Sequence, residues 1–213
     1  MAIAPREDGR GEVGFDARER ILRSMIGSVA ERGYAGTDVS EVIESAGVPS
    51  AIFDRLFAGK DDCVLAAYDW AVDPILDQVA TAYELGAATS WSEGVRRGLE
   101  ALLEAIAEQP DTARMALVEV PPISPDAHAR YRTTLERLAS LLRGGREYLG
   151  EDEEPPPQVE LMAVGGAEVI LVDEVSAGRA DQLPARMPEI LFAILVPYLG
   201  PEDAAAEMHA AAA

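Results

Sequence analysis

Apolar residues recur at the spacing of an α-helix through most of the chain, and the segment 37–60 shows this pattern twice in quick succession. Between its two apolar stripes lies Gly47, which can take the left-handed conformation that ends a helix, and Val48 follows to fill the corner. Pro49 and Ser50 supply a start signal for the second helix. The segment therefore predicts two short helices joined by a tight turn, a helix-turn-helix whose second helix enters the major groove of DNA. The stripes are Val39, Val42 and Ile43, then Ile52, Phe53, Leu56 and Phe57.

A longer helix is expected before this segment. Asp16 is a suitable N-cap, Glu19 follows at a spacing close to that of a capping box, and Gly33 provides the stop. Thr37 is then expected to cap the first short helix. The apolar positions of the long helix share one face, so the three helices would form a compact bundle. Those positions are Ile21, Leu22, Met25, Ile26 and Val29.

Six further helices are predicted after residue 60. Pro74 should kink or interrupt the first of them. The acidic, proline-rich stretch 151–158 is typical of a solvated linker. The expected helices are 61–85, 90–106, 109–120, 125–144, 159–177 and 183–199.

Composition narrows the class of protein. The chain has 213 residues, 48% of them apolar, which is typical of a folded globular protein. The single cysteine, Cys63, excludes a disulfide framework, and two histidines are too few for a histidine-based metal centre. No run approaches the roughly 20 apolar residues that span a bilayer. We therefore expect a cytoplasmic protein with no metal, no cofactor and no membrane association.

The negative charge is unevenly distributed. The formal net charge is −20, yet residues 1–60 carry 8 basic and 10 acidic side chains, against 10 basic and 28 acidic ones in the remainder. The acidity can be understood simply as a means of keeping the protein soluble. It also means that long-range attraction to DNA is weak, so local contacts must supply the affinity.

The run RERILRSMIGSVAERGYAGTDVSEVIESAGVPSAIFDRLFAGKDDCVLAAYD resembles the N-terminal domain of the TetR family of bacterial transcriptional repressors, of the actinobacterial type. The matching features are a long helix ending in Glu-Arg-Gly-Tyr, then Gly-Thr, then Ala-Gly-Val, then an aromatic helix ending at Phe57, with Lys60 opening a fourth helix. The resemblance implies an all-α chain with a helix-turn-helix DNA-binding domain at 15–60. A larger helical domain for ligand binding and dimerisation would follow at 61–200. Residues 1–14 and 201–213 are expected to be a disordered arm and tail.

The resemblance also implies which residues touch DNA. Thr37 and Lys60 fall where family members contact the backbone, and Lys60 is the only lysine of the chain. Ser50, Ala51 and Arg55 fall at exposed, early positions of the recognition helix. Arg55 would read guanine in two hydrogen bonds, or else form an ion pair with Asp54 or Asp61.

Asp54 departs from the family pattern, which usually has a phosphate-contacting tyrosine there, and Leu56 stands where a histidine is frequent. A carboxylate near phosphate would weaken binding. Three alternatives remain open at this point: Asp54 accepts a hydrogen bond from a cytosine amino group, pairs with Arg55 or another neighbour, or reduces the affinity for DNA.

Candidates in the larger domain are of two kinds. Trp91, Met115, Tyr131 and Met162 would line a pocket for a small, apolar ligand, although residues of these types are more often part of an ordinary core. In this family the last two long helices form the dimer interface. The residues expected there are Gly165, Gly166, Ile190, Leu191, Ile194 and Leu195.

No catalytic constellation stands out, because Cys63 follows two aspartates and has no histidine nearby in sequence. The sequence thus predicts a ligand-responsive repressor that binds a palindromic operator as a homodimer and is released by an inducer, and not an enzyme. The alternative is a helical dimeric module for ligands or proteins in which DNA binding is weakened.

Overall fold

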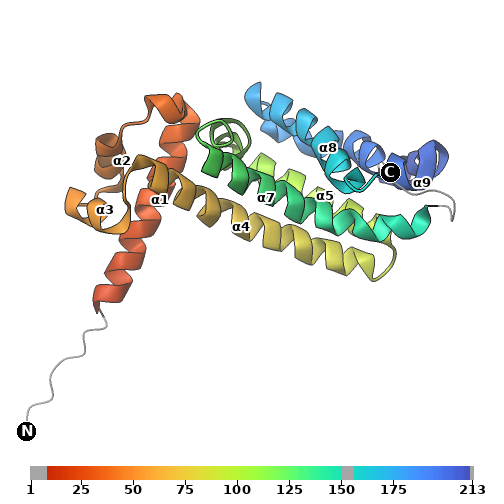
Figure 1. Ribbon diagram of the computed structural model, residues 1–213, viewed down its shortest axis with the longest axis horizontal. Coiled ribbons are helices and arrows are strands. Elements are labelled where there is room, and N and C mark those ends of the chain that lie inside the picture. The colour runs from red at the N-terminus through yellow and green to blue at the C-terminus, as the bar shows by residue number, and fades with distance from the viewer. Residues whose placement is uncertain (1–8, 150–155, 212–213) are drawn as a thin grey trace, which may run out of the picture. The chain divides into compact units, whose positions relative to one another are not determined.

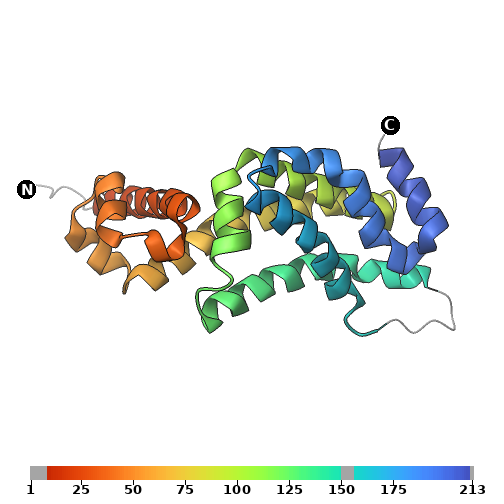
Figure 2. The same cartoon turned by 90° about the horizontal axis from the view of Figure 1, so that it is seen from above.

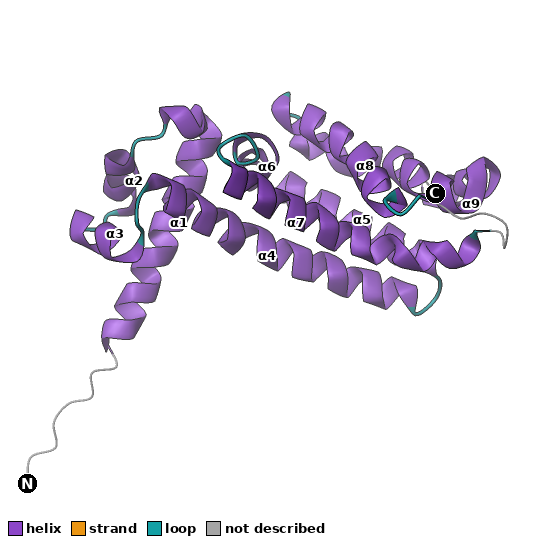
Figure 3. Cartoon of the chain, viewed as in Figure 1, coloured by secondary structure: helices purple, strands orange, loops and turns teal. Residues whose placement is uncertain are grey.

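The computed structural model describes residues 9–149 and 156–211, and every regular element within these ranges is helical (Figure 3). The chain divides into two units, Met1–Trp70 and Ala71–Ala213. Helix α4 (Lys60–Ala87) contributes to both units, so the division falls within this helix. From the sequence we had placed the boundary at the start of this helix, after residue 60. The all-α prediction is confirmed.

The first unit is built on α1 (Gly9–Gly36), with α2 (Val39–Ala46) and α3 (Ser50–Leu56) lying beside it (Figure 1). The apolar stripe of α1 is buried, as its spacing predicts. The helix begins at Gly9, within the stretch 1–14 that we expected to be an arm, while residues 1–8 lie outside the described residues. Gly33, with φ of 73°, breaks the regular helix where a stop was predicted.

Pro74 does not interrupt α4, which was one of the two effects expected of it. The helix is continuous from Lys60 to Ala87 and contains Pro74 within it. A proline in a helix interior removes one backbone hydrogen bond and crowds the preceding turn. The length and apolar packing of α4, with Val72, Leu76 and Val79 buried around this position, are sufficient to keep it helical.

The second unit packs its helices around an apolar core, with α8 against both α7 and α9 (Figure 2). Leu103, Met115 and Leu183 are among the side chains that are completely buried there. The elements after α4 are α5 (Trp91–Glu108), α6 (Pro110–Arg114), a π-helical turn (Met115–Glu119), α7 (Pro125–Leu141), a 3-10 segment (Leu142–Tyr148), α8 (Val159–Ser176), a second 3-10 segment (Ala180–Arg186) and α9 (Met187–Ala211).

The C-terminal segment is a helix and not the disordered tail that we expected at 201–213. The chain turns at Gly200, where φ is 73°, and helix resumes at Pro201 and continues to Ala211. Ala204 is fully buried, and the Ser92 hydroxyl donates a hydrogen bond of 2.9 Å to Glu207. The segment therefore docks on its own unit. Residues 212–213, like 150–155 of the predicted linker, lie outside the described residues.

One apolar segment of the described chain, Ala180–Ala211, is long and apolar enough by length and composition to cross a membrane. From the sequence we had expected no segment to approach the length and apolar composition of a membrane-spanning helix. In this unit, however, its inner side supplies core residues such as Leu183, Ile190 and Leu195. Packing within a folded unit accounts for the same apolar composition.

Candidate functional site

The turn between α2 and α3 has the backbone geometry that the sequence predicts. Gly47 takes φ of 62° and ψ of 41°, and its N–H donates to the carbonyl of Glu44 at 3.0 Å. The N–H of Val48 reaches back to the carbonyl of Ile43, and the Val48 side chain is buried. These bonds satisfy carbonyls that the end of a helix would otherwise leave unpaired. The chain can therefore reverse sharply and start α3 at Ser50.

The N-cap of α2 is Asp38 and not Thr37, which corrects our prediction. The Asp38 carboxylate accepts hydrogen bonds from the hydroxyl of Ser40 and, at 2.7 Å, from its backbone N–H, and these bonds, that of the hydroxyl first, lower the pKa of Asp38. Thr37 is 4% exposed, and its hydroxyl donates to the carbonyl of Gly33 at 2.9 Å. Because a hydroxyl has one proton to donate, this proton is already engaged. The contact of Thr37 with DNA stays a prediction.

Side chains of α1 fix the position of the helix-turn-helix, which the sequence analysis did not anticipate. Arg20 Nη1 donates to the carbonyls of Ala46 and Gly47, at 3.1 and 3.3 Å. The Ser24 hydroxyl donates to the carbonyl of Val42 at 3.0 Å. The available signal was an arginine directly before the buried apolar stripe that starts at Ile21. Its partners lie 26 and 27 residues away, beyond what local spacing can identify.

One side of α3 is exposed and does not pack against the core. Ser50, Ala51, Asp54 and Arg55 are exposed, whereas Phe53 is buried and its ring centroid lies 5.3 Å from that of Phe57. Four of the six residues predicted to touch DNA thus lie together on a single exposed surface. We call these four residues the α3 face.

Asp54 and Arg55 form no ion pair with each other or with any other described residue. The three arginines Arg20, Arg23 and Arg32 of the same unit each pair with a carboxylate. Asp61, the other partner considered for Arg55, accepts a hydrogen bond from the Tyr34 hydroxyl. The structure therefore gives no support to the alternative that Asp54 or Arg55 is held in an ion pair within the protein.

Lys60 begins α4 beside an aromatic ring. Its Nζ lies 4.2 Å from the centroid of the Tyr34 ring, a cation–π contact. The hydrogen bond with Asp61 raises the pKa of Tyr34 to about 12, so the hydroxyl remains protonated at neutral pH. The neighbouring Cys63 is completely buried, which raises the pKa of its thiol to about 12. It is a packing residue, as expected, because a nucleophile would need the thiolate.

Comparison with known proteins agrees with this geometry. Residues 21–67 match the model of the bacterial regulatory proteins of the tetR family. The transcriptional regulator AcuR of Cereibacter sphaeroides is 28% identical over 174 residues, which cover 73% of this chain and 75% of AcuR. Residues 21–67 thus carry the sequence signature of the tetR family, and the chain is similar to transcriptional regulators.

Solved structures of other regulators share the fold of this chain. The fatty acid degradation regulator FadR from Bacillus halodurans superposes with a TM-score of 0.72 at 18% identity, covering 83% of this chain and 97% of FadR. FadR from Bacillus subtilis, in complex with stearoyl-CoA, gives 0.71 at 16% identity, with 85% and 98% covered. TetR-family regulators bind DNA and act as dimers, and they are not enzymes.

The four predicted ligand contacts are not brought to one place. Trp91 is the first residue of α5, an 18-residue helix about 27 Å long, and Met115 comes after α6, which follows the far end of α5. Trp91 packs on Tyr198, with ring centroids 5.0 Å apart, and Tyr131 donates a hydrogen bond to Glu168. Met162 is 66% exposed and so does not line an interior pocket.

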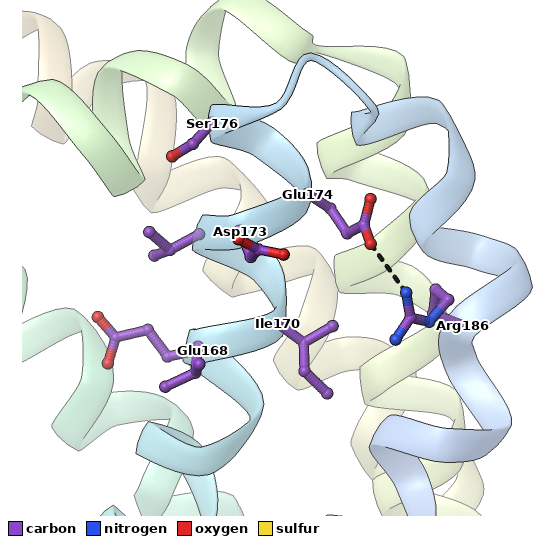
Figure 4. Close-up of a pocket in the computed structure, with 8 residues that line it drawn as sticks. Glu168, Ile170, Asp173, Glu174, Ser176 and Arg186 are labelled. Carbon is purple, nitrogen blue, oxygen red and sulfur yellow. Dashed lines mark hydrogen bonds and ion pairs between the residues drawn. The ribbon is translucent and has the colours of Figure 1, made fainter.

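An open hollow of about 600 Å³ lies along α8, and none of these four residues lines it, although Tyr131 donates its hydrogen bond to Glu168, which does. Val169 and Ile170 give it an apolar floor, and Glu174 forms an ion pair of 2.8 Å with Arg186 at its edge (Figure 4). Bonds to Arg179 and Arg186 lower the pKa of Glu174. In the part of the chain that the structure describes, no group of three His, Cys, Asp or Glu side chains is placed to hold a metal ion.

The predicted dimer residues divide into two sets. Gly165 and Gly166 lie on the open side of α8, where an added Cβ would meet no atom within 4 Å. The four residues chosen in α9 are instead buried within the protomer, so a partner cannot reach their side chains, and this part of the prediction is wrong. Met162 and Val169, at 66% and 69% exposed, flank the two glycines on α8. The buried residues are Ile190, Leu191, Ile194 and Leu195.

Proposed function

We propose that this chain is a cytoplasmic, ligand-responsive transcriptional repressor that binds a palindromic operator as a homodimer. The observation that carries the proposal is the α3 face, which is exposed, free of ion pairs within the described residues, and held by Arg20 and the left-handed turn at Gly47. A helix presented in this way suits the major groove. Thr37 and Lys60 would contribute contacts to the DNA backbone.

Dimerisation is proposed through the open side of α8, together with the outward residues of α9. Gly165 and Gly166 leave room for another backbone, and Met162 and Val169 supply exposed apolar surface beside them. Phe192 of α9 is only partly buried and extends this surface. Two copies joined here would place their α3 helices in successive major grooves, about 34–36 Å apart.

An effector with an apolar portion is proposed to release the DNA. The interior of the second unit is apolar, with Leu99, Leu103 and Leu171 among its core residues. A protein of the same fold, FadR from Bacillus subtilis, is known in complex with stearoyl-CoA. An effector acts only if it binds the released state more tightly than the DNA-bound state. Thermal-shift measurements with stearoyl-CoA and acetyl-CoA would test whether the acyl chain contributes to binding.

The DNA-binding proposal is tested by a mobility-shift titration of the full-length protein on the DNA upstream of its own coding sequence, at several salt concentrations. We expect sequence-selective binding below micromolar protein. A shuffled duplex of equal length and composition is the control. Equal affinity for both duplexes at every salt concentration contradicts the repressor.

One alternative is favoured by a specific observation, the carboxylate of Asp54 on the α3 face of a protein with a net charge of −20. Under this alternative the chain is a dimeric helical module that binds a ligand or a protein, and its DNA binding is weakened. The same titration separates the two functions, because the module would still dimerise and bind its effector without selecting any duplex.

A further inference from the structure

Asp54 lies near the middle of the α3 face and not at its edge. Successive residues of a helix are rotated by about 100°, so with Ser50 at zero, Asp54 lies at about 40°, Ala51 at about 100° and Arg55 at about 140°. The inward side is formed by Ile52, Leu56 and Phe53, at about 200°, 240° and 300°. When a helix occupies a groove, the middle of its outward face meets the base edges and its sides meet the two backbones. This position therefore directs Asp54 at bases.

Neither Asp54 nor Arg55 has a partner of its own in the described part of the first unit. At the spacing of one helical turn, Asp54 is preceded by Ser50 and followed by Ala58, and Arg55 is preceded by Ala51 and followed by Gly59. None of these neighbours carries a charge. Both side chains are thus available to an external partner, one as an acceptor and the other as a donor.

The chemistry of the major groove gives each side chain a preferred base. An ionised carboxylate can only accept hydrogen bonds, and the amino group of cytosine is the donor that aspartate pairs with there. Guanine and thymine present acceptor oxygens to the groove, which would repel it. A guanidinium prefers the two acceptors of guanine. Asp54 therefore favours cytosine and penalises sequences that lack it, because its charge would then be desolvated without a partner.

We propose that Asp54 is a specificity-determining residue of this regulator, and that each operator half-site contains a G·C pair whose cytosine lies at Asp54. This inference rests on the proposed DNA-binding function. In a protein with a net charge of −20, the carboxylate lowers the affinity for all other sequences as well. Asp54 therefore increases selectivity by weakening binding to sequences without this cytosine, and it lowers the overall affinity for DNA.

The test is selection from a randomised duplex library with the full-length wild-type protein and with Asp54→Asn and Asp54→Ala, followed by mobility-shift titration. Asparagine prefers adenine. We expect Asp54→Asn to change one cytosine per half-site to adenine, symmetrically, and Asp54→Ala to lose the preference there. Each correct base should be favoured by about 5- to 150-fold. Both variants should melt as the wild type does, since Asp54 is exposed.

Glu44→Gln is the matched control. It removes an exposed carboxylate from α2, in the same unit but outside the α3 face, so it should leave the selected sequence unchanged. If the wild type selects a sequence but Asp54→Asn selects the same one, this inference is overturned while the repressor stands. If the wild type selects no sequence, the inference and the DNA-binding function fail together.

Discussion

Gly47 ends α2 in a left-handed conformation, with φ of 62°. A residue with a side chain pays about 1–2 kcal/mol to adopt that conformation. We therefore expect Gly47→Ala to lower the free energy of unfolding by about 1–2 kcal/mol, measured by urea denaturation. Gly27 is the control: it lies within α1, and an added Cβ there meets no atom within 4 Å. Gly27→Ala should instead stabilise, by up to about 1 kcal/mol. Destabilisation of similar size by both changes would show that the φ at Gly47 is not the cause.

Arg20 joins α1 to the last carbonyls of α2 through two hydrogen bonds. Arg20→Ala should cost about 1–2 kcal/mol of unfolding free energy, because both carbonyls then turn to water, and should weaken DNA binding through a less well-fixed turn. The measurements are thermal denaturation and a mobility-shift titration. Glu19→Gln is the control, since it breaks the exposed ion pair of Arg23 on the same helix, which is worth less than about 1 kcal/mol. Equal losses in both variants would contradict the role assigned to Arg20.

At the scale of the helices, the sequence is most informative where an apolar stripe is narrow. The stripes of α1 and α3 identify the buried side correctly, and with it the exposed α3 face. Helix α9 is apolar nearly all round, so its composition cannot tell which side faces the core. The structure turns Ile190 and Ile194 inward, leaves Phe192 partly buried at the edge of the core, and exposes Ala193. This is why the predicted dimer residues of α9 were wrong while the helix itself was right.

The spacing of apolar residues also could not predict where the chain departs from a regular α-helix. Residues 109–120 were expected to form one helix, but α6 passes into a π-helical turn at Met115–Glu119. Arg114 and Glu119, five residues apart, form an ion pair of 3.5 Å across this turn. Residues at that separation point in different directions on an α-helix, and the wider turn brings them together. Such a turn depends on packing against α8, which local pattern does not contain.

The helical segment after Gly200 should contribute to the stability of the second unit. Deleting residues 201–213 removes the buried Ala204 and the hydrogen bond between Ser92 and Glu207. We expect a loss of about 1–2 kcal/mol in unfolding free energy, measured by thermal denaturation. Glu207→Ala should cause part of this loss, and deleting residues 212–213 alone should cause none. A truncated chain that melts with the full-length protein would show that the segment does not dock in solution.

At the scale of the whole molecule, the proposed dimer depends on exposed apolar residues of α8. Val169→Asp should give a monomer in sedimentation velocity at micromolar protein, because a charge at a helix–helix interface must be desolvated without a partner. Leu85→Asp is the matched control: Leu85 is 65% exposed and Val169 is 69% exposed, but Leu85 lies on α4. It should leave the dimer intact. A dimer that survives Val169→Asp, or that is lost in both variants, would place the interface elsewhere.

The salt dependence of binding reports how many phosphates the basic side chains of this acidic protein neutralise. Lys60 is its only lysine and lies against the Tyr34 ring, from which its ammonium can reach a phosphate. Each phosphate contact contributes about −0.9 to the slope of log K against log salt concentration. Lys60→Ala removes two contacts per dimer, so it should weaken binding to all duplexes alike and make the slope less steep by about 1.8. Lys60→Arg keeps the charge and should retain the slope. An unchanged slope in Lys60→Ala would mean that the ammonium remains on the Tyr34 ring, so that other groups carry the backbone contacts.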